Sequence, residues 1–220
     1  MALRIYWKRF LSGANFVSVP LRRSSEALPR SGTRGFTVLE LVIVVAITLI
    51  LAGTASFQIA AAIRQAHINA AVQIVERELR NAHEKSVDTR TEYVVTFQTP
   101  GKILTQTIAA GELTAPTSID LPNDEQFLIV PGVTSAPENP PFGSAKRAID
   151  FDLGNGGGSN VLFFYPDGTV IDAAGNLNNG VAYIAHPADL YSSKAVTIWG
   201  ATGRVKIWTL AGKGGATQWR

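Results

Sequence analysis

The apolar residues of this chain form three successive patterns, and the first is an uninterrupted apolar stretch. Residues 41–63 contain no charged side chain over 23 positions. At ~1.5 Å per residue, a helix of this length extends about 35 Å, which is enough to cross the hydrocarbon core of a bilayer. Glu40 stands directly before the stretch. Because a lone carboxylate at the edge of lipid is costly, the pattern predicts a membrane-spanning helix with a functional residue at its start.

The second pattern is amphipathic and continues the same helix. From residue 64 to about residue 86, apolar positions recur at steps of three and four, which is the spacing of one helix face. These positions are Ile68, Val72, Val75, Leu79 and Ala82. The other face is charged, with Glu76, Arg80 and Glu84 at i, i+4 spacing. We expect one helix from Phe36 to near Val87, apolar all round in its first half and laid on a globular domain by its second half.

The third pattern, after Asp88, consists of short apolar runs separated by turn residues, as in a β-rich domain. Pro-Gly and Pro-Asp-Gly turns mark two hairpins, whereas residues 109–148 hold six prolines and little regular pattern. The expected strands are residues 93–97, 103–108, 127–130, 149–153, 161–165, 169–171, 181–185, 195–199 and 204–210. Strands after one helix predict an α+β fold, in which a long N-terminal helix, transmembrane in its first half, packs by its second half on a C-terminal antiparallel β-rich domain.

Charge is distributed unevenly along the chain. Residues 1–35 carry seven Lys/Arg and one acid, a net charge of +6, whereas the remaining 185 residues have 13 basic and 16 acidic side chains, a net charge of −3. The positive-inside rule therefore places residues 1–35 in the cytoplasm and the C-terminal domain outside. The overall basic charge does not indicate nucleic-acid binding, because it belongs to the N-terminal segment. The lack of cysteine excludes disulfides, thiolate nucleophiles and cysteine-based metal sites.

Two simpler accounts of the apolar stretch leave Glu40 unexplained. An ordinary secretory signal would use residues 41–52 as its apolar core and the small residues at 53–55 as its cleavage site. A plain transmembrane anchor would need only the length. Signal peptides carry positive charge at this junction, however, and the Ala-rich helical pattern continues past Ala55. We therefore favour a processing and assembly signal, with the ordinary signal peptide as the alternative.

One segment resembles the processing signal of type IV pilins and pseudopilins: Gly35-Phe36-Thr37-Val38-Leu39-Glu40-Leu41, followed by the apolar stretch. The resemblance implies that a prepilin peptidase removes residues 1–35 by cutting between Gly35 and Phe36, and that Phe36 is then N-methylated. It also implies that the Glu40 carboxylate meets the N-terminal amine of a neighbouring subunit. Such pairing relieves the cost of burying either charge and fixes the axial register between subunits.

Later residues resemble one subgroup, the GspH/FimT-type pseudopilins, whose globular part is a β-rich domain that covers the helix. The resemblance lies in the segment Phe-Tyr-Pro-Asp-Gly-Thr, residues 164–169, and in a late Gly-Arg, residues 203–204. Some FimT-like proteins are associated with DNA uptake through Gly-Arg-x-Arg, and here Lys206 takes the fourth position. Strand alternation places Arg204, Lys206 and Trp208 on one face, which would hold a nucleic-acid backbone and stack on bases. We favour the alternative that this face is a solvated strand surface.

The sequence contains no constellation that supports catalysis or metal binding. His67 and His83 are 16 residues apart on the expected helix, too far to share a metal ion, and no cysteine supports them. The Gly-rich segment 154–159 lacks the Lys-Ser/Thr ending of a phosphate-binding loop and precedes a strand. We therefore expect no enzymatic activity, no cofactor and no metal.

Together these patterns predict four regions. They are a leader at 1–35, a transmembrane and assembly helix at 36–63, an amphipathic helix at 64–88 and a β-rich periplasmic domain at 89–220. The resemblance implies a minor pseudopilin of a type II secretion system, single-pass in the inner membrane, which serves protein export. The implied partners are other pilins or pseudopilins, prepilin peptidase, the inner-membrane assembly platform, membrane lipid and an exoprotein substrate. The alternative is a FimT-like minor type IV pilin that binds DNA for uptake.

Overall fold

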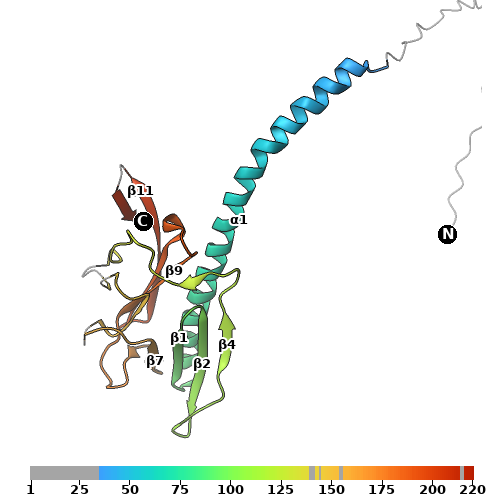
Figure 1. The fold of residues 1–220 in the computed structure, drawn as a ribbon. Coiled ribbons are helices and arrows are strands. Elements are labelled where there is room, and N and C mark those ends of the chain that lie inside the picture. Colours follow the sequence, from blue (N-terminus) through green and yellow to red (C-terminus); the bar gives the residue numbers. More distant parts are fainter. Residues whose placement is uncertain (1–34, 139–141, 144, 154–155, 214–215) are drawn as a thin grey trace, which may run out of the picture. The chain divides into compact units, whose positions relative to one another are not determined.

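The chain divides into two compact units, and one helix contributes to both (Figure 1). The computed structural model describes residues 35–138, 142–143, 145–153, 156–213 and 216–220. The units are Met1–Ile47 and Thr48–Arg220. The predicted leader, residues 1–35, lies outside the described residues apart from Gly35. Helix α1 extends over Val38–Thr89, which confirms the prediction of one long helix.

In the second unit, α1 packs on the β-structure through a single stripe. The stripe begins at Ile68, and its residues are at most 2 % exposed. Its members are Ile68, Ala71, Val72, Val75, Leu79 and Ala82. All five positions that the helical spacing predicted are therefore confirmed as buried. The helix ends at Thr89, and Arg90 adopts a left-handed conformation with φ of 52°. A residue in this conformation turns the chain out of the helix, here toward the first strand.

The first sheet is antiparallel and has six strands. They are β1 (Tyr93–Gln98), β2 (Lys102–Ala109), β3 (Glu112–Leu113), β4 (Thr117–Asp120), β7 (Val161–Phe164) and β8 (Val170–Ile171). Their order is β3-β2-β1-β7-β8, with β4 also paired to β2. The predicted hairpins β1–β2 and β7–β8 are confirmed. Strands β3 and β4 were not predicted, because they are short and have few buried side chains.

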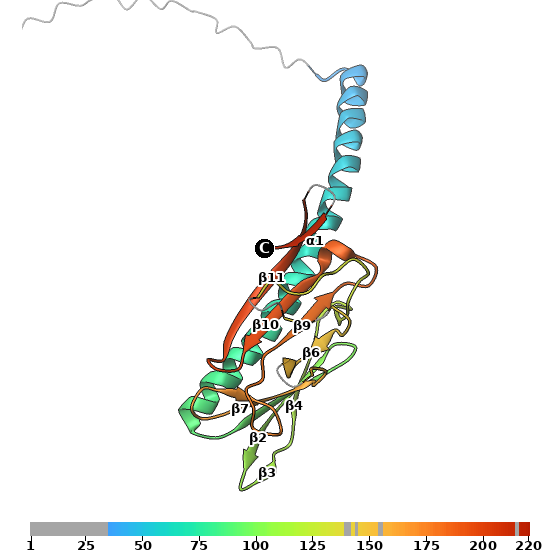
Figure 2. The same cartoon turned by 90° about the vertical axis from the view of Figure 1, so that its left-hand side faces the viewer.

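The second sheet is also antiparallel and has six strands. They are β5 (Gln126–Phe127), β6 (Ile149–Asp150), β9 (Gly180–Ala185), β10 (Lys194–Trp199), β11 (Arg204–Lys213) and β12 (Ala216–Trp219). The order is β12-β11-β10-β9-β5, with β6 also paired to β9. A short 3₁₀ helix, η2 (Leu190–Ser192), precedes β10. Figure 2 shows β10 and β11 running along the part of α1 that belongs to the same unit.

One hydrophobic core joins the α1 stripe to both sheets. The first sheet contributes side chains from β1, β2, β7 and β8, among them Phe97 and Phe164. The second sheet contributes side chains from β5, β9, β10 and β11, among them Phe127 and Ile184. The Phe97 ring lies 5.4 Å from that of Phe127 and 5.0 Å from that of Phe151, measured between ring centroids. The domain is therefore α+β, as predicted, with a single core beneath the helix.

A second core covers the other face of the second sheet. All six residues of β9 are buried, and they alternate between the two cores. Val181 and Tyr183 face the second core, which the Pro-rich segment closes with Ala136 and Phe142. The Tyr183 hydroxyl accepts a hydrogen bond from the Ala136 N–H at 3.1 Å and donates one to the Phe142 carbonyl at 3.4 Å. This segment, which showed no regular pattern, is thus a structural cover.

Two predicted strands are shorter than expected, for local backbone reasons. The run at residues 127–130 forms a strand only at Gln126–Phe127, because the chain soon reaches Pro131, which has no N–H to donate to a neighbouring strand. The run at residues 149–153 forms one only at Ile149–Asp150, because Asp152 has a φ of 63°. A left-handed residue cannot continue an extended strand.

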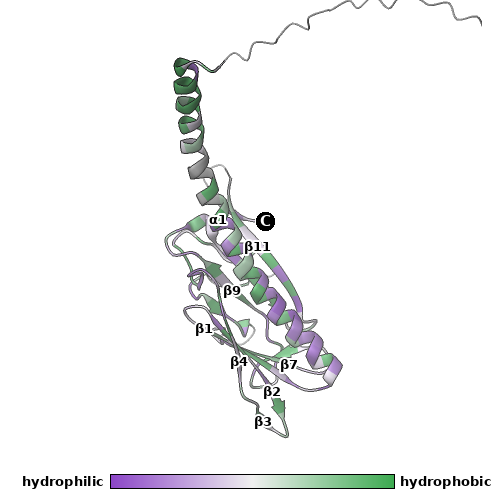
Figure 3. Cartoon of the chain, turned by 90° about the vertical axis from the view of Figure 1, so that its right-hand side faces the viewer, coloured by the Kyte–Doolittle hydropathy of each residue, from purple (hydrophilic) through white to green (hydrophobic). Residues whose placement is uncertain are grey.

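The first half of α1 carries exposed apolar side chains. Figure 3 shows hydrophobic colouring in the turns after residue 38 and mixed colouring in the later turns. Between Phe36 and Ile63, the large apolar side chains that the structure describes are 47 to 81 % exposed. We predicted that residues 36–63 form a transmembrane helix. Over the described part of the chain, no helix combines the length and the apolar character that a membrane span requires.

The aromatic contacts of Phe97 make its side chain the most sensitive point of the main core. Phe97 is 0 % exposed. We expect Phe97→Ala to lower the free energy of unfolding by ~3–5 kcal/mol, because it removes a buried ring and leaves a cavity between the two sheets. Leu113→Ala on the exposed strand β3 is the control and is expected to change it by about 0.5 kcal/mol or less. Urea unfolding followed by tryptophan fluorescence measures both, and similar losses would contradict this account of the core.

Candidate functional site

The segment that resembles a processing signal lies where α1 begins. Gly35, Phe36 and Thr37 precede the helix, whose first residue is Val38. Thr37 caps the helix, because its Oγ1 accepts a hydrogen bond from the Glu40 backbone N–H at 3.2 Å. Its carbonyl accepts another from the N–H of the residue after Glu40, at 3.1 Å. Threonine at this position satisfies an N–H group that the helix geometry leaves without a partner. The bond between Gly35 and Phe36 thus lies in non-helical chain just ahead of a capped helix.

Glu40 occupies the first turn of the capped helix, and its side chain is exposed. Partial positive charge at a helix N-terminus favours a carboxylate there. The spacing Thr37-x-x-Glu40 is that of a capping box, a signal that the sequence contained and that we did not use. Among the ion pairs between described residues, none involves the Glu40 carboxylate. The cap engages the backbone of this residue, so its charge is open to a partner from another molecule.

The comparisons with known proteins address this end of the chain. The family model of the prokaryotic N-terminal methylation motif matches residues 30–56. The chain carries the prepilin-type signal of type IV pilins and pseudopilins. The matched segment contains Gly35, Phe36 and Glu40 and ends before the packed part of α1. Comparisons with curated proteins and with solved structures found no match. The signal implies processing by a prepilin peptidase, assembly with other pilins and anchoring through the N-terminal helix.

The residues that resemble the GspH/FimT subgroup meet at one point of α1. The Tyr165–Thr169 turn joins β7 to β8, and its Gly168 carbonyl lies 3.0 Å from His83 Nε2. Ser86 donates a hydrogen bond to the Tyr165 carbonyl at 3.1 Å. Gly203 has a φ of 62°, and a Cβ there would collide with the His83 ring. Both short motifs therefore hold strand ends onto the C-terminal part of the helix.

The third predicted site lies on the β10–β11 hairpin. Val205 and Ile207 face the main core, so the alternating residues Arg204, Lys206 and Trp208 face away from α1, as expected from strand alternation. Arg204 Nη2 lies 3.3 Å from the Glu138 carboxylate, which belongs to the Pro-rich cover and is 8 % exposed. The guanidinium also lies 5.3 Å from the centroid of the Trp199 ring, a second tie to its own domain.

Lys206 and Trp208, on the same strand face as Arg204, also make contacts within the domain. Lys206 Nζ lies 3.5 Å from the centroid of the Trp208 ring. The Trp208 indole N–H donates to Thr197 Oγ1 at 3.1 Å, and Thr197 Oγ1 donates to Glu138 at 2.8 Å. Trp208 also packs against the second core. The side chains of Arg204 and Lys206 are nevertheless exposed. The solvated strand face that we favoured and DNA binding there both stay predictions.

In the described part of the chain, no set of side chains is assembled to bind a metal ion. No group of three or more His, Asp or Glu side chains there is placed to hold a metal ion. His83, one of the two helix histidines considered from the sequence, is engaged with Gly168. The other, His67, lies near Glu125.

The ion pair between Arg204 and Glu138 predicts unequal effects of two cation substitutions. Arg204→Ala removes the partner of a buried carboxylate, and we expect a loss of about 1 kcal/mol in the free energy of unfolding, since the arginine side chain is 55 % exposed. Lys206→Ala is the matched control on the same strand face, with an expected change of ~0.5 kcal/mol or less. Thermal or urea unfolding measures both. Equal losses would show that Glu138 does not depend on Arg204.

Proposed function

We propose that this chain is a structural protein, a minor pseudopilin of a type II secretion pseudopilus. The observation that carries the proposal is the prepilin-type signal at residues 30–56, with Glu40 exposed at the head of an apolar helix. In this proposal a prepilin peptidase cuts between Gly35 and Phe36, Phe36 is N-methylated, and the subunit joins the filament through α1. Partner proteins supply the energy and the cut, and the chain itself supplies a shape that pushes exoproteins outward.

The exposed apolar half of α1 supports assembly by this route. The described large apolar side chains between Phe36 and Ile63 are exposed, and a protein in water would cover such a surface. In the proposal, lipid covers this surface in the inner membrane, with the C-terminal domain in the periplasm, and neighbouring pilin helices cover it in the filament. The assembly platform in the inner membrane would transfer the subunit between the two states.

The Glu40 carboxylate would fix the register of each new subunit. Inside a bundle of apolar helices, an isolated carboxylate or amine is strongly disfavoured, and bringing the two together relieves much of that cost. The amine created at Phe36 is the natural partner, because other cations are absent from the apolar stretch. Only one axial offset between neighbouring helices brings the two groups together, so the pair selects that offset.

The alternative function, a FimT-like minor pilin that binds DNA, has a specific obstacle. Arg204 already pairs with Glu138, and Lys206 lies over the Trp208 ring, so a nucleic acid would compete with these contacts. Removing Arg204 from a buried carboxylate carries a cost that binding would need to recover. We therefore give the secretion role precedence over DNA uptake.

The cleavage site is tested by blocking it. Gly35→Leu places a bulky side chain at the proposed cut, and we expect the full-length chain to accumulate in cells that contain a prepilin peptidase. The wild-type chain should yield a product that begins with N-methylated Phe36, as determined by mass spectrometry of the intact protein. Ala55→Leu, which destroys the alternative small-residue cleavage site at 53–55, should leave this product unchanged. A wild-type product that begins after residue 55 would refute the proposal.

The register role of Glu40 is tested separately from cleavage. We expect Glu40→Leu to be cut normally but to enter filaments at least ~100-fold less efficiently, since loss of one partner of a buried ion pair costs about 3 kcal/mol or more. Glu84→Leu, an exposed acid on the later part of α1, is the matched control and should assemble. Recovery of the subunit in sheared filament fractions measures the effect. Assembly of the Glu40→Leu chain at the wild-type level would disprove the register role.

A further inference from the structure

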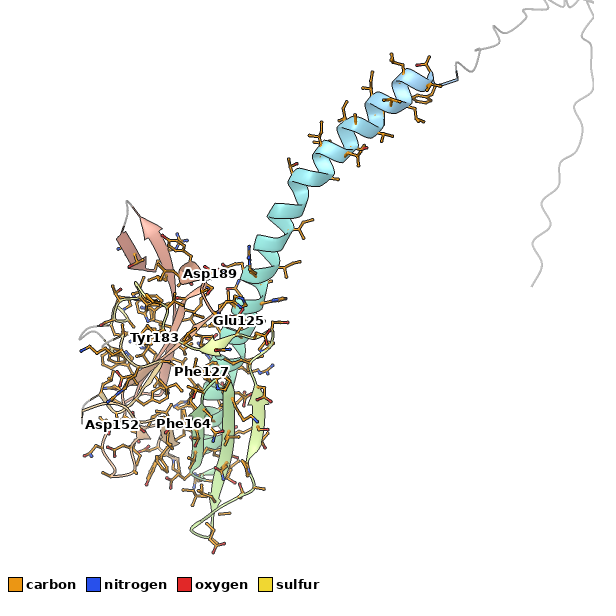
Figure 4. The ribbon with its side chains drawn as sticks, in the orientation of Figure 1. Glu125, Phe127, Asp152, Phe164, Tyr183 and Asp189 are labelled. Atoms are coloured by element: carbon orange, nitrogen blue, oxygen red, sulfur yellow. The ribbon has the colours of Figure 1, made fainter. Side chains whose placement is uncertain are left out.

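A buried carboxylate lies where the packed part of α1 begins, and the proposed function does not use it. Glu125, just ahead of β5, is 3 % exposed (Figure 4). Its Oε1 lies 3.6 Å from Nδ1 of His186, the residue after β9. Its Oε2 is buried and has no hydrogen-bond partner among the described residues. A half-satisfied carboxylate in a protein interior is costly, so its retention there requires an explanation.

The backbone before Glu125 holds it in this position. Asn123 and Asp124 both adopt left-handed conformations, with φ of 58° and 60°. Each such residue costs about 1 kcal/mol when it is not glycine, although Asn and Asp tolerate the conformation best. On the other side, the Phe127 N–H donates to the Pro100 carbonyl at 2.6 Å, and the Phe127 ring lies in the main core. The carboxylate is thus fixed between a strained turn and a buried anchor.

Four ionisable groups from three parts of the fold act on the Glu125 carboxylate. His67 belongs to α1 and directly precedes Ile68, the first buried residue of the stripe, and His186 follows β9. Asp189 caps η2 through a hydrogen bond from the Tyr191 N–H, and Asp124 is the neighbour of Glu125 in its own loop. Of these four groups, His186 is the one that lies beside the carboxylate, at 3.6 Å from Oε1.

We propose that Glu125 and His186 form a proton-dependent clamp, which holds the segment before β5 against the end of β9 when the carboxylate gains a proton. The added proton removes the uncompensated negative charge from the interior. Its loss leaves a buried carboxylate with no hydrogen bond at Oε2 among the described residues, and the contact weakens. This inference is independent of secretion or DNA uptake, because it concerns the stability of the domain itself.

The direction of the pH dependence follows from burial. Burial raises the pKa of Glu125 above its ordinary value of 4.5, and the two histidines only partly oppose this shift. The folded protein therefore binds a proton more tightly than the unfolded chain does. The contribution of the cluster to stability is complete below pH 4.5 and is lost as the pH rises through the raised pKa of Glu125. One such proton changes the unfolding equilibrium constant by up to ~10-fold per pH unit.

The clamp is tested with the full chain in detergent by urea unfolding between pH 5 and pH 8. Tryptophan fluorescence is a suitable readout, because Trp199, Trp208 and Trp219 all belong to the second sheet or its edge. We compare the wild type with Glu125→Gln, which keeps the shape and removes the charge. Glu112→Gln on exposed strand β3 is the matched control. Apart from the substituted glutamate, each variant has the same titrating groups as the wild type. A difference in pH dependence between the wild type and Glu125→Gln therefore reports on Glu125.

We expect the unfolding constant of the wild type to rise, relative to that of Glu125→Gln, as the pH increases above 4.5. Glu112→Gln should follow the wild type. An identical pH dependence in the wild type and Glu125→Gln would overturn the clamp. If Glu125→Gln does not fold, His186→Gln provides the test, because His186 lowers the pKa of Glu125 and its removal leaves the effect of burial less opposed. The loss of stability should then occur at higher pH than in the wild type, and an unchanged pH dependence would overturn the proposal.

Discussion

The burial of one apolar stripe of α1 is the contact on which the domain depends. From Ile68 to Ala82 this stripe supplies the surface on which two separate antiparallel sheets close a single core. No strand of one sheet pairs with a strand of the other among the described residues, so packing against the helix and against each other's side chains joins them. Because both sheets pack on this stripe, α1 must stay helical over the whole length of the stripe. Its polar face, with pairs such as Glu76 and Arg80 at 2.7 Å, remains available to solvent.

The same requirement explains why the second sheet is covered on both faces. Strand β9 is buried on its two sides, and only one side faces α1. The part of the Pro-rich segment between β5 and β6 covers the other side, and its described residues form only the isolated bridge of Ala136 with Phe142. Proline fixes φ and lacks an N–H group, so this segment is suited to lie across a sheet and unsuited to extend it. Specific hydrogen bonds then attach it, from Trp219 to the Thr134 carbonyl at 3.0 Å and from Thr197 to Glu138 at 2.8 Å.

Local patterns in the sequence predicted the long helix and most of the strands. Contacts between residues that are distant in the sequence could not be predicted in this way. Three-and-four spacing located the buried stripe of α1, and Pro-Gly and Pro-Asp-Gly turns located two hairpins, because periodicity and turn chemistry are local properties. The Thr37-x-x-Glu40 cap was equally local and could have been read. By contrast, Arg204 was chosen as an exposed cation, and its partner Glu138 lies 66 positions away in a segment with no pattern. The pair of Glu125 and His186 joins the loop before β5 to the end of β9, which only the tertiary fold brings together.

Three glutamates illustrate how this chain places carboxylates in different surroundings. Glu138 is buried and satisfied, since Thr197 donates to one oxygen and Arg204 pairs with the other. Glu125 is buried, and its Oε2 has no hydrogen-bond partner among the described residues; in the proposed clamp, a proton on the carboxylate relieves this cost. Glu40 is exposed, and a carboxylate that water solvates needs no partner. In the proposed assembly, a covering that buries the apolar side chains around Glu40 also removes its water. The carboxylate would then need a positive charge from its surroundings, and in the proposal the amine of Phe36 in a neighbouring subunit supplies that charge.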